Sequence, residues 1–171
     1  MIHGRFQPFH LGHLEYLKGA AARSDEVFVG ITNPDPSQVR PEASDPVRHL
    51  PESNPYTYVE RMLMVKAAAA DAAVAPDRLH VVPFPVNTPE LWEAYVPPDV
   101  VQYIRLFSDW GGTKLERLRD AGFEVVVLDE GAEKELSGAE VRAAIREGRE
   151  WEQLVPPGVA DVIKRLERVA V

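Results

Sequence analysis

The densest group of side chains suited to chemistry lies in residues 4–13, which read GRFQPFHLGH. His10 and His13 flank a Leu-Gly pair directly before a helical pattern. The start of a helix presents free backbone N–H groups that bind anions, and both imidazoles can face an anion held there. Gly12 lacks a Cβ that would block a phosphate, and Arg5 adds a guanidinium that suits phosphate oxygens. This segment predicts a nucleotide triphosphate site, with a polar loop of two solvated histidines as the alternative.

A second candidate anion site lies near the end of the chain. Ser137 precedes a helical stretch, and Glu140 has the spacing of a capping box. The N-terminus of that helix offers further N–H groups, and Arg142 follows about a turn and a third into it. From spacing alone, Ser137 is a helix cap and Arg142 is a solvated surface arginine.

The apolar pattern predicts strands that alternate with helices, which favours a parallel sheet with helices on both faces. We expect an α/β fold: one Rossmann-like domain over residues 1–171, about five strands, and a C-terminal helical segment. Residues 33–55 show no periodicity and predict a long functional or disordered loop. The first expected strand ends near Gly4, and the other four span 27–32, 79–84, 100–107 and 123–128. The expected helices span 12–22, 57–73, 113–121, 137–148 and 159–169.

Composition excludes several classes of protein. The chain has 171 residues and a net charge of −8, from 27 acidic and 19 basic residues, so we expect no nucleic-acid partner. It has no cysteine, which excludes disulfides and thiolate metal sites. No apolar run approaches the ~20 residues needed to span a bilayer, and no signal-peptide pattern is visible. We therefore expect a cytoplasmic protein with no membrane partner. The sequence leaves open whether the protein forms a homo-oligomer.

Four segments resemble motifs of the HxGH-type nucleotidyltransferase superfamily, whose fold is cytidylyltransferase-like. Within it, the chain is most similar to the archaeal-type nicotinamide-nucleotide adenylyltransferases. Residues 4–13 resemble the HxGH signature, and residues 54–61 (NPYTYVER) resemble that family's DPFTxxER segment. Residues 82–92 resemble its IP…LW segment, and residues 137–142 (SGAEVR) resemble its SGTEVR segment.

The resemblance implies roles for named residues. His10, His13 and Arg142 would stabilise the transferring phosphates, and Trp92 matches the tryptophan that stacks on nicotinamide. Arg61 and Asn87 are weaker acceptor candidates, while Trp92 and Arg61 are equally well explained as core residues. The implied nucleotide-binding set is Gly4, Arg5, Phe6, Gln7, His10, Gly12, His13, Ser137, Gly138 and Arg142.

Two segments depart from the family and put the acceptor in doubt. Where the nicotinamide enzymes carry an SGN-type segment, this chain has Asp109 and Trp110. The loop 33–55 is longer than in the archaeal enzymes, and it brings cations near the expected site. We therefore add five acceptor candidates: Asp109, Trp110, Arg40, Arg48 and His49.

The expected reaction joins an acceptor phosphate or phosphonate to the α-phosphorus of a nucleoside triphosphate and expels pyrophosphate. Such an acceptor is already anionic, so alignment and charge stabilisation are the main requirements. We expect Mg²⁺ to arrive with the triphosphate and no protein metal site. Transfer of adenylate from ATP to nicotinamide mononucleotide is the nearest family activity. The alternatives are a cytidylyltransferase that uses CTP and a small phosphonate or phosphorylated alcohol, and a non-catalytic nucleotide sensor.

Overall fold

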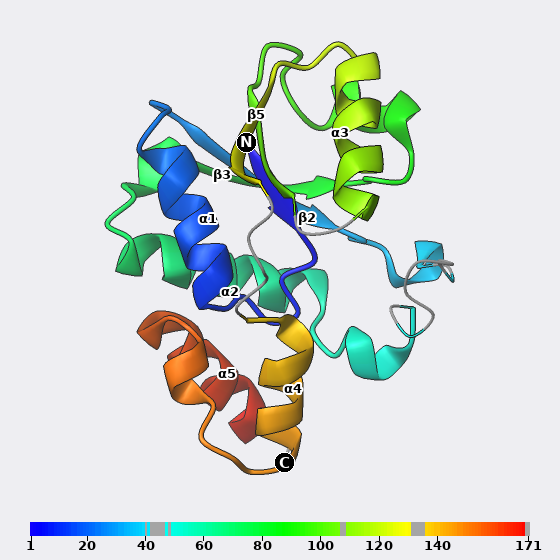
Figure 1. Cartoon of the computed structure of the whole chain (residues 1–171). Helices are drawn as coiled ribbons and strands as arrows, with labels where there is room; N and C mark the ends of the chain where they lie inside the picture. The colour runs from blue at the N-terminus through cyan, green and yellow to red at the C-terminus, as the bar shows by residue number, and fades with distance from the viewer. Residues whose placement is uncertain (40, 42–46, 48, 107–108, 131–135, 170–171) are drawn as a thin grey trace.

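A parallel α/β arrangement forms the centre of the protein in a computed structural model (Figure 1). The structure describes residues 1–39, 41, 47, 49–106, 109–130 and 136–169. The elements that position the site follow in this order: β1 (Ile2–Gly4), α1 (Leu11–Ala21), β2 (Val27–Thr32), α2 (Tyr58–Asp71), β3 (Leu79–Phe84), β4 (Gln102–Leu106), α3 (Asp109–Asp120), β5 (Val125–Glu130), α4 (Gly138–Arg146) and α5 (Pro157–Val169).

The strands form two parallel sheets in the part of the chain that the structure describes. One has the order β1-β2-β3, and the other pairs β4 with β5. The two meet where Tyr103 N donates to Met1 O at 2.8 Å, so β4 lies beside β1. The α/β class and the parallel pairing are confirmed. The expectation of one sheet of about five strands is corrected to a three-stranded and a two-stranded sheet. The reason is that β1 has only three residues, and the hydrogen bond to β4 is made by Met1, which precedes β1.

Element boundaries follow local chemistry. Thr57 and Glu60 form the expected capping box, with Glu60 N donating to Thr57 Oγ1 at 3.3 Å and Thr57 N to Glu60 Oε2 at 2.7 Å. The start of α3 is four residues earlier than expected, at Asp109 rather than Thr113. Gly111 and Gly112 disfavour a helix interior and concealed this start. The loop 33–55 is not wholly irregular, since it carries short 3₁₀ helices at Pro36–Gln38 and Pro51–Ser53.

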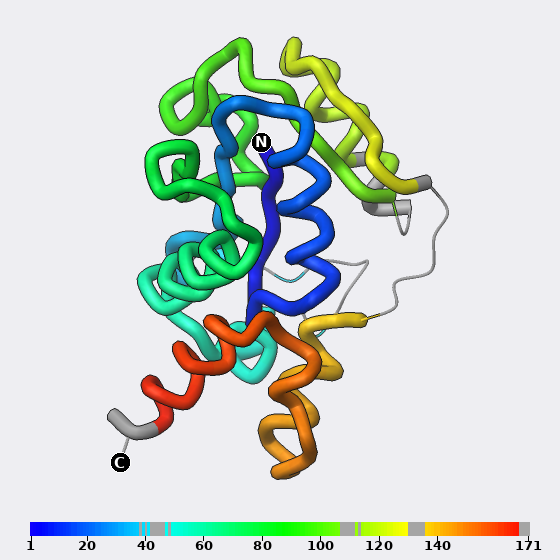
Figure 2. The backbone as a smooth tube through the Cα atoms, turned by 90° about the vertical axis from the view of Figure 1, so that its left-hand side faces the viewer, coloured from blue at the N-terminus to red at the C-terminus, as the bar shows by residue number. Residues whose placement is uncertain are grey.

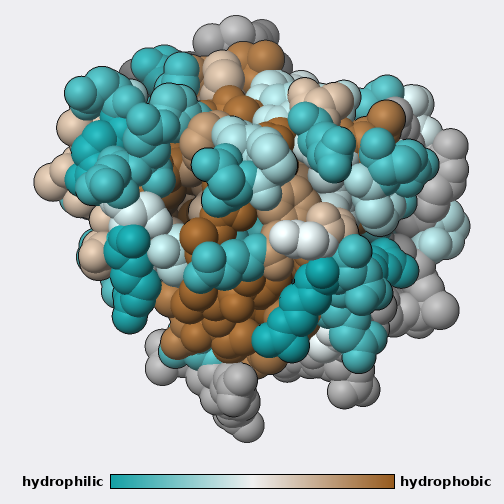
Figure 3. Space-filling view, turned by 90° about the horizontal axis from the view of Figure 1, so that it is seen from above, coloured by the Kyte–Doolittle hydropathy of each residue, from teal (hydrophilic) through white to brown (hydrophobic). Residues whose placement is uncertain are grey.

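Two apolar clusters lie on opposite faces of the strands. The larger one joins α1, α2, α4 and α5 to residues such as Ile2 and Val29, and α5 packs against α2. In Figure 2, β1 runs through the middle of the molecule toward α4 and α5. The smaller cluster joins α3 to Phe84, Trp92 and Ile104. Figure 3, seen from above, shows apolar residues gathered between hydrophilic ones on that face of the molecule.

No helix among the described residues is long and apolar enough to cross a membrane.

Gly30 on β2 is required by the close packing of β1, β2 and β3. A Cβ there would lie 2.4 Å from Met1 Cε, 2.9 Å from Phe84 Cβ and 3.1 Å from His3 Cβ. Phe84 Cβ is fixed by its backbone, so Gly30→Ala must shift a strand. We expect it to lower the free energy of unfolding by about 1–3 kcal/mol, the usual cost of overpacking.

Urea denaturation followed by circular dichroism measures this loss. The matched control is Gly112→Ala, where a Cβ would meet nothing within 4 Å. That change should leave stability equal or raise it by up to about 1 kcal/mol through helix propensity. Equal stability of the two variants would contradict the packing argument.

Candidate functional site

The loop between β1 and α1 is anchored by aromatic side chains. Phe6 and Phe9 are buried, and their ring centroids lie 5.2 Å apart. Phe6 adopts φ 53°, a left-handed conformation that costs a non-glycine residue free energy. A Cβ at Gly4 would lie 3.0 Å from the Phe6 ring, so the strand ends on a residue that leaves room for the ring. Burial of both rings thus holds a strained backbone in place.

Gln7 joins this loop to two other segments. Its side-chain Oε1 accepts from Tyr56 N at 3.0 Å, and its Nε2 donates to Tyr56 O at 2.9 Å. Its main-chain oxygen accepts from Arg142 Nη1 on α4 at 2.6 Å. A Cβ at Gly138 would lie 2.7 Å from that same oxygen, so α4 begins on a glycine that permits the approach. Gln7 therefore fixes residues 4–13 and residues 137–142 against each other.

Arg61 fixes the neighbouring strand ends from beneath. Its side chain is buried, and its guanidinium donates to four main-chain oxygens: Thr32 O at 2.7 Å, Asn33 O at 2.9 Å, Arg5 O at 3.0 Å and Thr57 O at 3.3 Å. Burial lowers the pKa of Arg61 to about 10, so it stays charged at neutral pH. These contacts make Arg61 a support for the loop.

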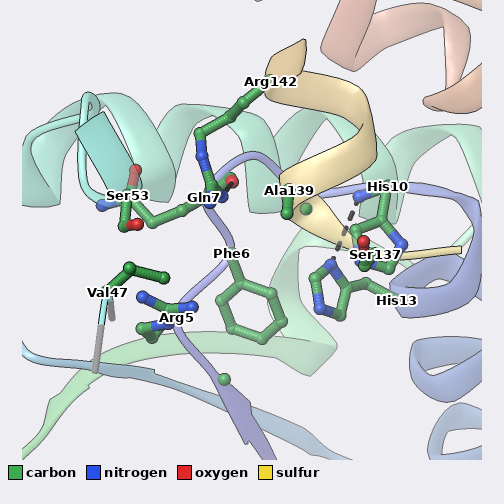
Figure 4. A pocket seen from close by; sticks show the side chains of 12 residues that line it. Arg5, Phe6, Gln7, His10, His13, Val47, Ser53, Ser137, Ala139 and Arg142 are labelled. Carbon is green, nitrogen blue, oxygen red and sulfur yellow. Dashed lines mark hydrogen bonds between the residues drawn. The ribbon is translucent and has the colours of Figure 1, made fainter. Parts of the chain in front are cut away.

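The two histidines lie together at the start of α1. Their ring centroids are 3.7 Å apart in a stacked arrangement. The backbone N–H of His10 donates to His13 Nδ1 at 3.3 Å (Figure 4). The expected role of Gly12 is refined by the structure. A Cβ at Gly12 would lie 3.1 Å from the His10 ring, so the glycine makes room for this buried imidazole.

A cavity of about 330 Å³ is lined by all the predicted nucleotide residues except Gly12 (Figure 4). Arg5, Arg142 and the two histidines supply positive or protonatable groups, and no carboxylate is among the described residues that line it. A protein with net charge −8 thus presents a cationic cavity. The lining comprises Gly4, Arg5, Phe6, Gln7, His10, His13, Val47, Ser53, Ser137, Gly138, Ala139 and Arg142.

The capping box at α4 is confirmed. Glu140 N donates to Ser137 Oγ at 3.3 Å, and Ser137 N donates to Glu140 Oε2 at 2.6 Å. Ser137 is therefore both the helix cap and a residue of the cavity wall. The cap directs the start of α4 at the loop that carries the histidines.

None of the predicted acceptor residues that the structure describes lines this cavity. Trp92 is buried between Phe84 and Phe123, and its Nε1 donates to Pro85 O at 2.9 Å. Asn87 is exposed, and His49 is half-buried outside the cavity lining. Four more predicted residues cannot be placed at the site: Arg40 and Arg48 lie outside the described residues, and the side chains of Asp109 and Trp110 are not described.

Four residues near the site were missed by sequence reasoning. Val47 and Ser53 line the cavity from the long segment before α2, and Ala139 lines it from α4. The types of these three residues carry no signal of a site. Arg105 on β4 donates to Asp129 Oδ2 at 2.7 Å and to Gly12 O at 3.0 Å. Opposite charges at the carboxyl ends of adjacent predicted strands were the signal that could have found Arg105.

Comparison with known proteins places this geometry in a family. A family model described as cytidylyltransferase-like matches residues 1–144, which include β1, the histidine pair and Arg142. The chain belongs to the cytidylyltransferase-like family. It is a nucleotidyltransferase, as are the relatives that it resembles over almost its whole length.

Two curated relatives differ in the substrates that their names state. The phosphonoformate cytidylyltransferase of Streptomyces viridochromogenes is 49% identical over 164 residues, covering 96% of this chain and 89% of that protein. The nicotinamide-nucleotide adenylyltransferase of Thermococcus kodakarensis is 33% identical over 168 residues, covering 97% and 82%.

A solved structure confirms the fold. The bifunctional NMN adenylyltransferase/ADP ribose pyrophosphatase of Francisella tularensis matches with a TM-score of 0.69 and 16% identity, over 98% of this chain. The chain spans about half of that protein, 48% of its length. Another structure of the Francisella protein contains AMP and a manganese ion.

The approach of α4 to Gln7 generates a prediction. Gly138→Ala would push its Cβ against Gln7 O, 2.7 Å away, and so separate Ser137 and Arg142 from the histidines. Since a misplacement of about 1 Å can cost about 10²-fold in rate, we expect kcat/KM to fall by about that factor. Pyrophosphate release measures it.

Ala143→Gly on the same helix is the control. It weakens α4 by about 1 kcal/mol without touching the loop, and it should leave kcat/KM nearly unchanged. Equal losses in the two variants would assign the effect to a loosened helix instead.

Proposed function

We propose that this nucleotidyltransferase transfers cytidylate from CTP to a small phosphonate that carries a carboxylate, with release of pyrophosphate. The observation that carries the proposal is the state of Trp92. Its ring is 2% exposed and its N–H is bonded to Pro85 O, so it offers no free face for a nicotinamide ring. The greater identity to a phosphonoformate cytidylyltransferase, 49% against 33%, supports the same choice.

The cavity supplies the binding that this reaction requires. A phosphonate oxygen attacks the α-phosphorus, a new P–O bond forms, and the bond from the α-phosphorus to the bridging oxygen breaks. Negative charge grows on the α-phosphoryl oxygens and on the departing pyrophosphate. His10, His13, Arg5 and Arg142 line one cavity and provide donors for that charge. The phosphonate is already an anion, so no side chain needs to remove a proton from it.

In this proposal the histidine pair and Arg142 stabilise the transferring and leaving phosphates. Gly4, Phe6, Gln7 and Gly138 shape the wall, and Gly12 makes room for the His10 ring. Residues 1–171 would act as one nucleotidyltransferase domain in the cytoplasm. The described residues contain no group of three or more His, Asp or Glu that could hold a metal ion. We infer that Mg²⁺ enters as part of the substrate, bound to the triphosphate.

A panel of substrates tests the function. Pyrophosphate release is measured with CTP, ATP, GTP and UTP, each crossed with phosphonoformate, methylphosphonate and nicotinamide mononucleotide. We expect the highest kcat/KM with CTP and phosphonoformate. Highest activity with ATP and nicotinamide mononucleotide would establish the adenylyltransferase alternative. Binding of a nucleotide by calorimetry without pyrophosphate release from any pair would support the sensor alternative.

Removal of one imidazole tests the phosphate site. We expect His10→Asn and His13→Asn each to lower kcat by about 10²-fold, the loss that follows removal of one donor to a developing anion. Asparagine keeps a polar group at the buried His10 position, so the fold should survive.

The control is His80→Asn, at a half-buried histidine on β3. Its Nε2 lies 3.1 Å from Glu26 Oε2, and it is not among the residues that line the cavity. Its kcat should equal that of the unchanged protein. Near-normal turnover in both site variants would remove the histidine pair from the reaction.

A further inference from the structure

His3 is a buried polar residue at the carboxyl end of β1. It is 4% exposed and pairs in register with Gly30 on β2. Its neighbour Ile2 belongs to the larger apolar cluster, and successive side chains of a strand point to opposite faces. The imidazole accordingly packs on the other face, 4.9 Å from the Phe84 ring. It therefore faces the side of the sheet that carries α3 and the segment after β3.

The polar atoms around His3 are unsatisfied. Neither ring nitrogen reaches a partner with the geometry of a full hydrogen bond, and the same holds for Oε1 of Gln102. The Gln102 side chain is fully buried and close enough to the imidazole to interact with it weakly. The Gln102 amide nitrogen lies 3.4 Å from Met1 Sδ, a weak acceptor. A buried polar group without a partner costs about 1–3 kcal/mol, whereas a leucine here would cost nothing of this kind. Such a cluster inside an apolar core indicates a ligand that supplies the missing partners.

Its place in the fold points to the acceptor. Open α/β sheets bind ligands at the carboxyl ends of the strands, beside the point where the strand order reverses. Here that point lies between β1 and β4. His3 lies one residue before the carboxyl end of β1, while Gln102 is the first residue of β4 and supports the imidazole from below that edge. Gly4, the next residue, lines the cationic cavity. The nucleotide residues gather in that cavity, so the opposite face of β1 is left for the other substrate.

The electrostatics of His3 suit an anionic ligand atom. Burial and the nearby ammonium group of Lys114 on α3 hold the pKa of His3 well below its ordinary value of 6.5. The ring is therefore neutral at neutral pH and carries one N–H donor. A neutral donor beside a lysine binds a carboxylate, and Lys114 is half-buried.

We propose that His3 determines acceptor specificity: its ring N–H, together with Lys114, binds the carboxylate of a small carboxylated phosphonate while the phosphonate faces the nucleotide. This inference rests on the proposed function, since it assigns the second anionic group of the same acceptor. Gln102 acts as a positioning residue that orients the imidazole.

The test compares two acceptors that differ by the carboxylate. His3→Leu is assayed by pyrophosphate release at saturating CTP with phosphonoformate and with methylphosphonate. We expect the KM for phosphonoformate to rise about 10–100-fold, the effect of losing a hydrogen bond to a charged group. The KM values for methylphosphonate and CTP should stay the same, and the melting temperature should stay equal or rise. Lys114→Ala should change the phosphonoformate KM in the same direction, and His80→Leu is the control histidine.

A second measurement does not depend on turnover or on a stable leucine variant. In protein with ¹⁵N-labelled histidine, the His3 ring resonances are those missing from the spectrum of His3→Leu or His3→Gln. Phosphonoformate should shift them, and methylphosphonate should not. An unchanged ratio of the two KM values in an active variant, or a rise in the KM for CTP, would overturn the specificity role alone. Absence of pyrophosphate from the unchanged protein with every pair would overturn the proposed function, while the resonance shift still reports whether His3 binds the carboxylate.

Discussion

The paired hydrogen bonds between the Gln7 side chain and the backbone of Tyr56 hold the site in its shape. The Gln7 amide uses both its donor and its acceptor there, while the Gln7 main-chain oxygen receives Arg142. Segments 49 and 135 residues away in sequence are thereby tied to one residue. Because the histidine pair follows directly in the chain, its position relative to α4 depends on these contacts. A buried amide with both groups satisfied also resists rearrangement, since any alternative leaves polar atoms unpaired.

Arg61 complements this arrangement by an unusual use of charge. A buried cation commonly pairs with a carboxylate, yet the Arg61 guanidinium donates to four main-chain oxygens. Carbonyl dipoles compensate the burial without cancelling the net charge, so positive potential remains beneath the loop of Arg5. The cavity gains a favourable field for phosphates, and the backbone gains a fixed frame. Replacing such a group by an apolar one would leave several buried oxygens without donors, which links stability and binding at this position.

Local chemistry explains which features were predictable from the sequence. The capping boxes at Thr57 and Ser137 and the strands 27–32 and 79–84 depend on near neighbours, and they formed where expected. The gathering of the histidines, Arg5 and Arg142 followed from motifs at helix starts. The division of the sheet, the support by Arg61 and the burial of Trp92 depend on contacts between distant segments, which spacing does not encode. Gly12 shows the difference at one residue, since its missing Cβ makes room for the His10 imidazole, a contact that spacing did not reveal.

The two faces of β1 give the strand a double function. Its loop turns toward α1 and α4 and carries the groups that line the cationic cavity. Its penultimate residue, His3, turns toward Phe84 and α3, where sequence reasoning placed the acceptor candidates after β3 and at Asp109. A three-residue strand with neighbours on both sides leaves little freedom to move one substrate relative to the other. In-line transfer demands such fixed alignment more than it demands a strong base, because the acceptor is already ionised. Gly30, which admits His3, Met1 and Phe84 above β2, is thus as much a condition for substrate alignment as for packing.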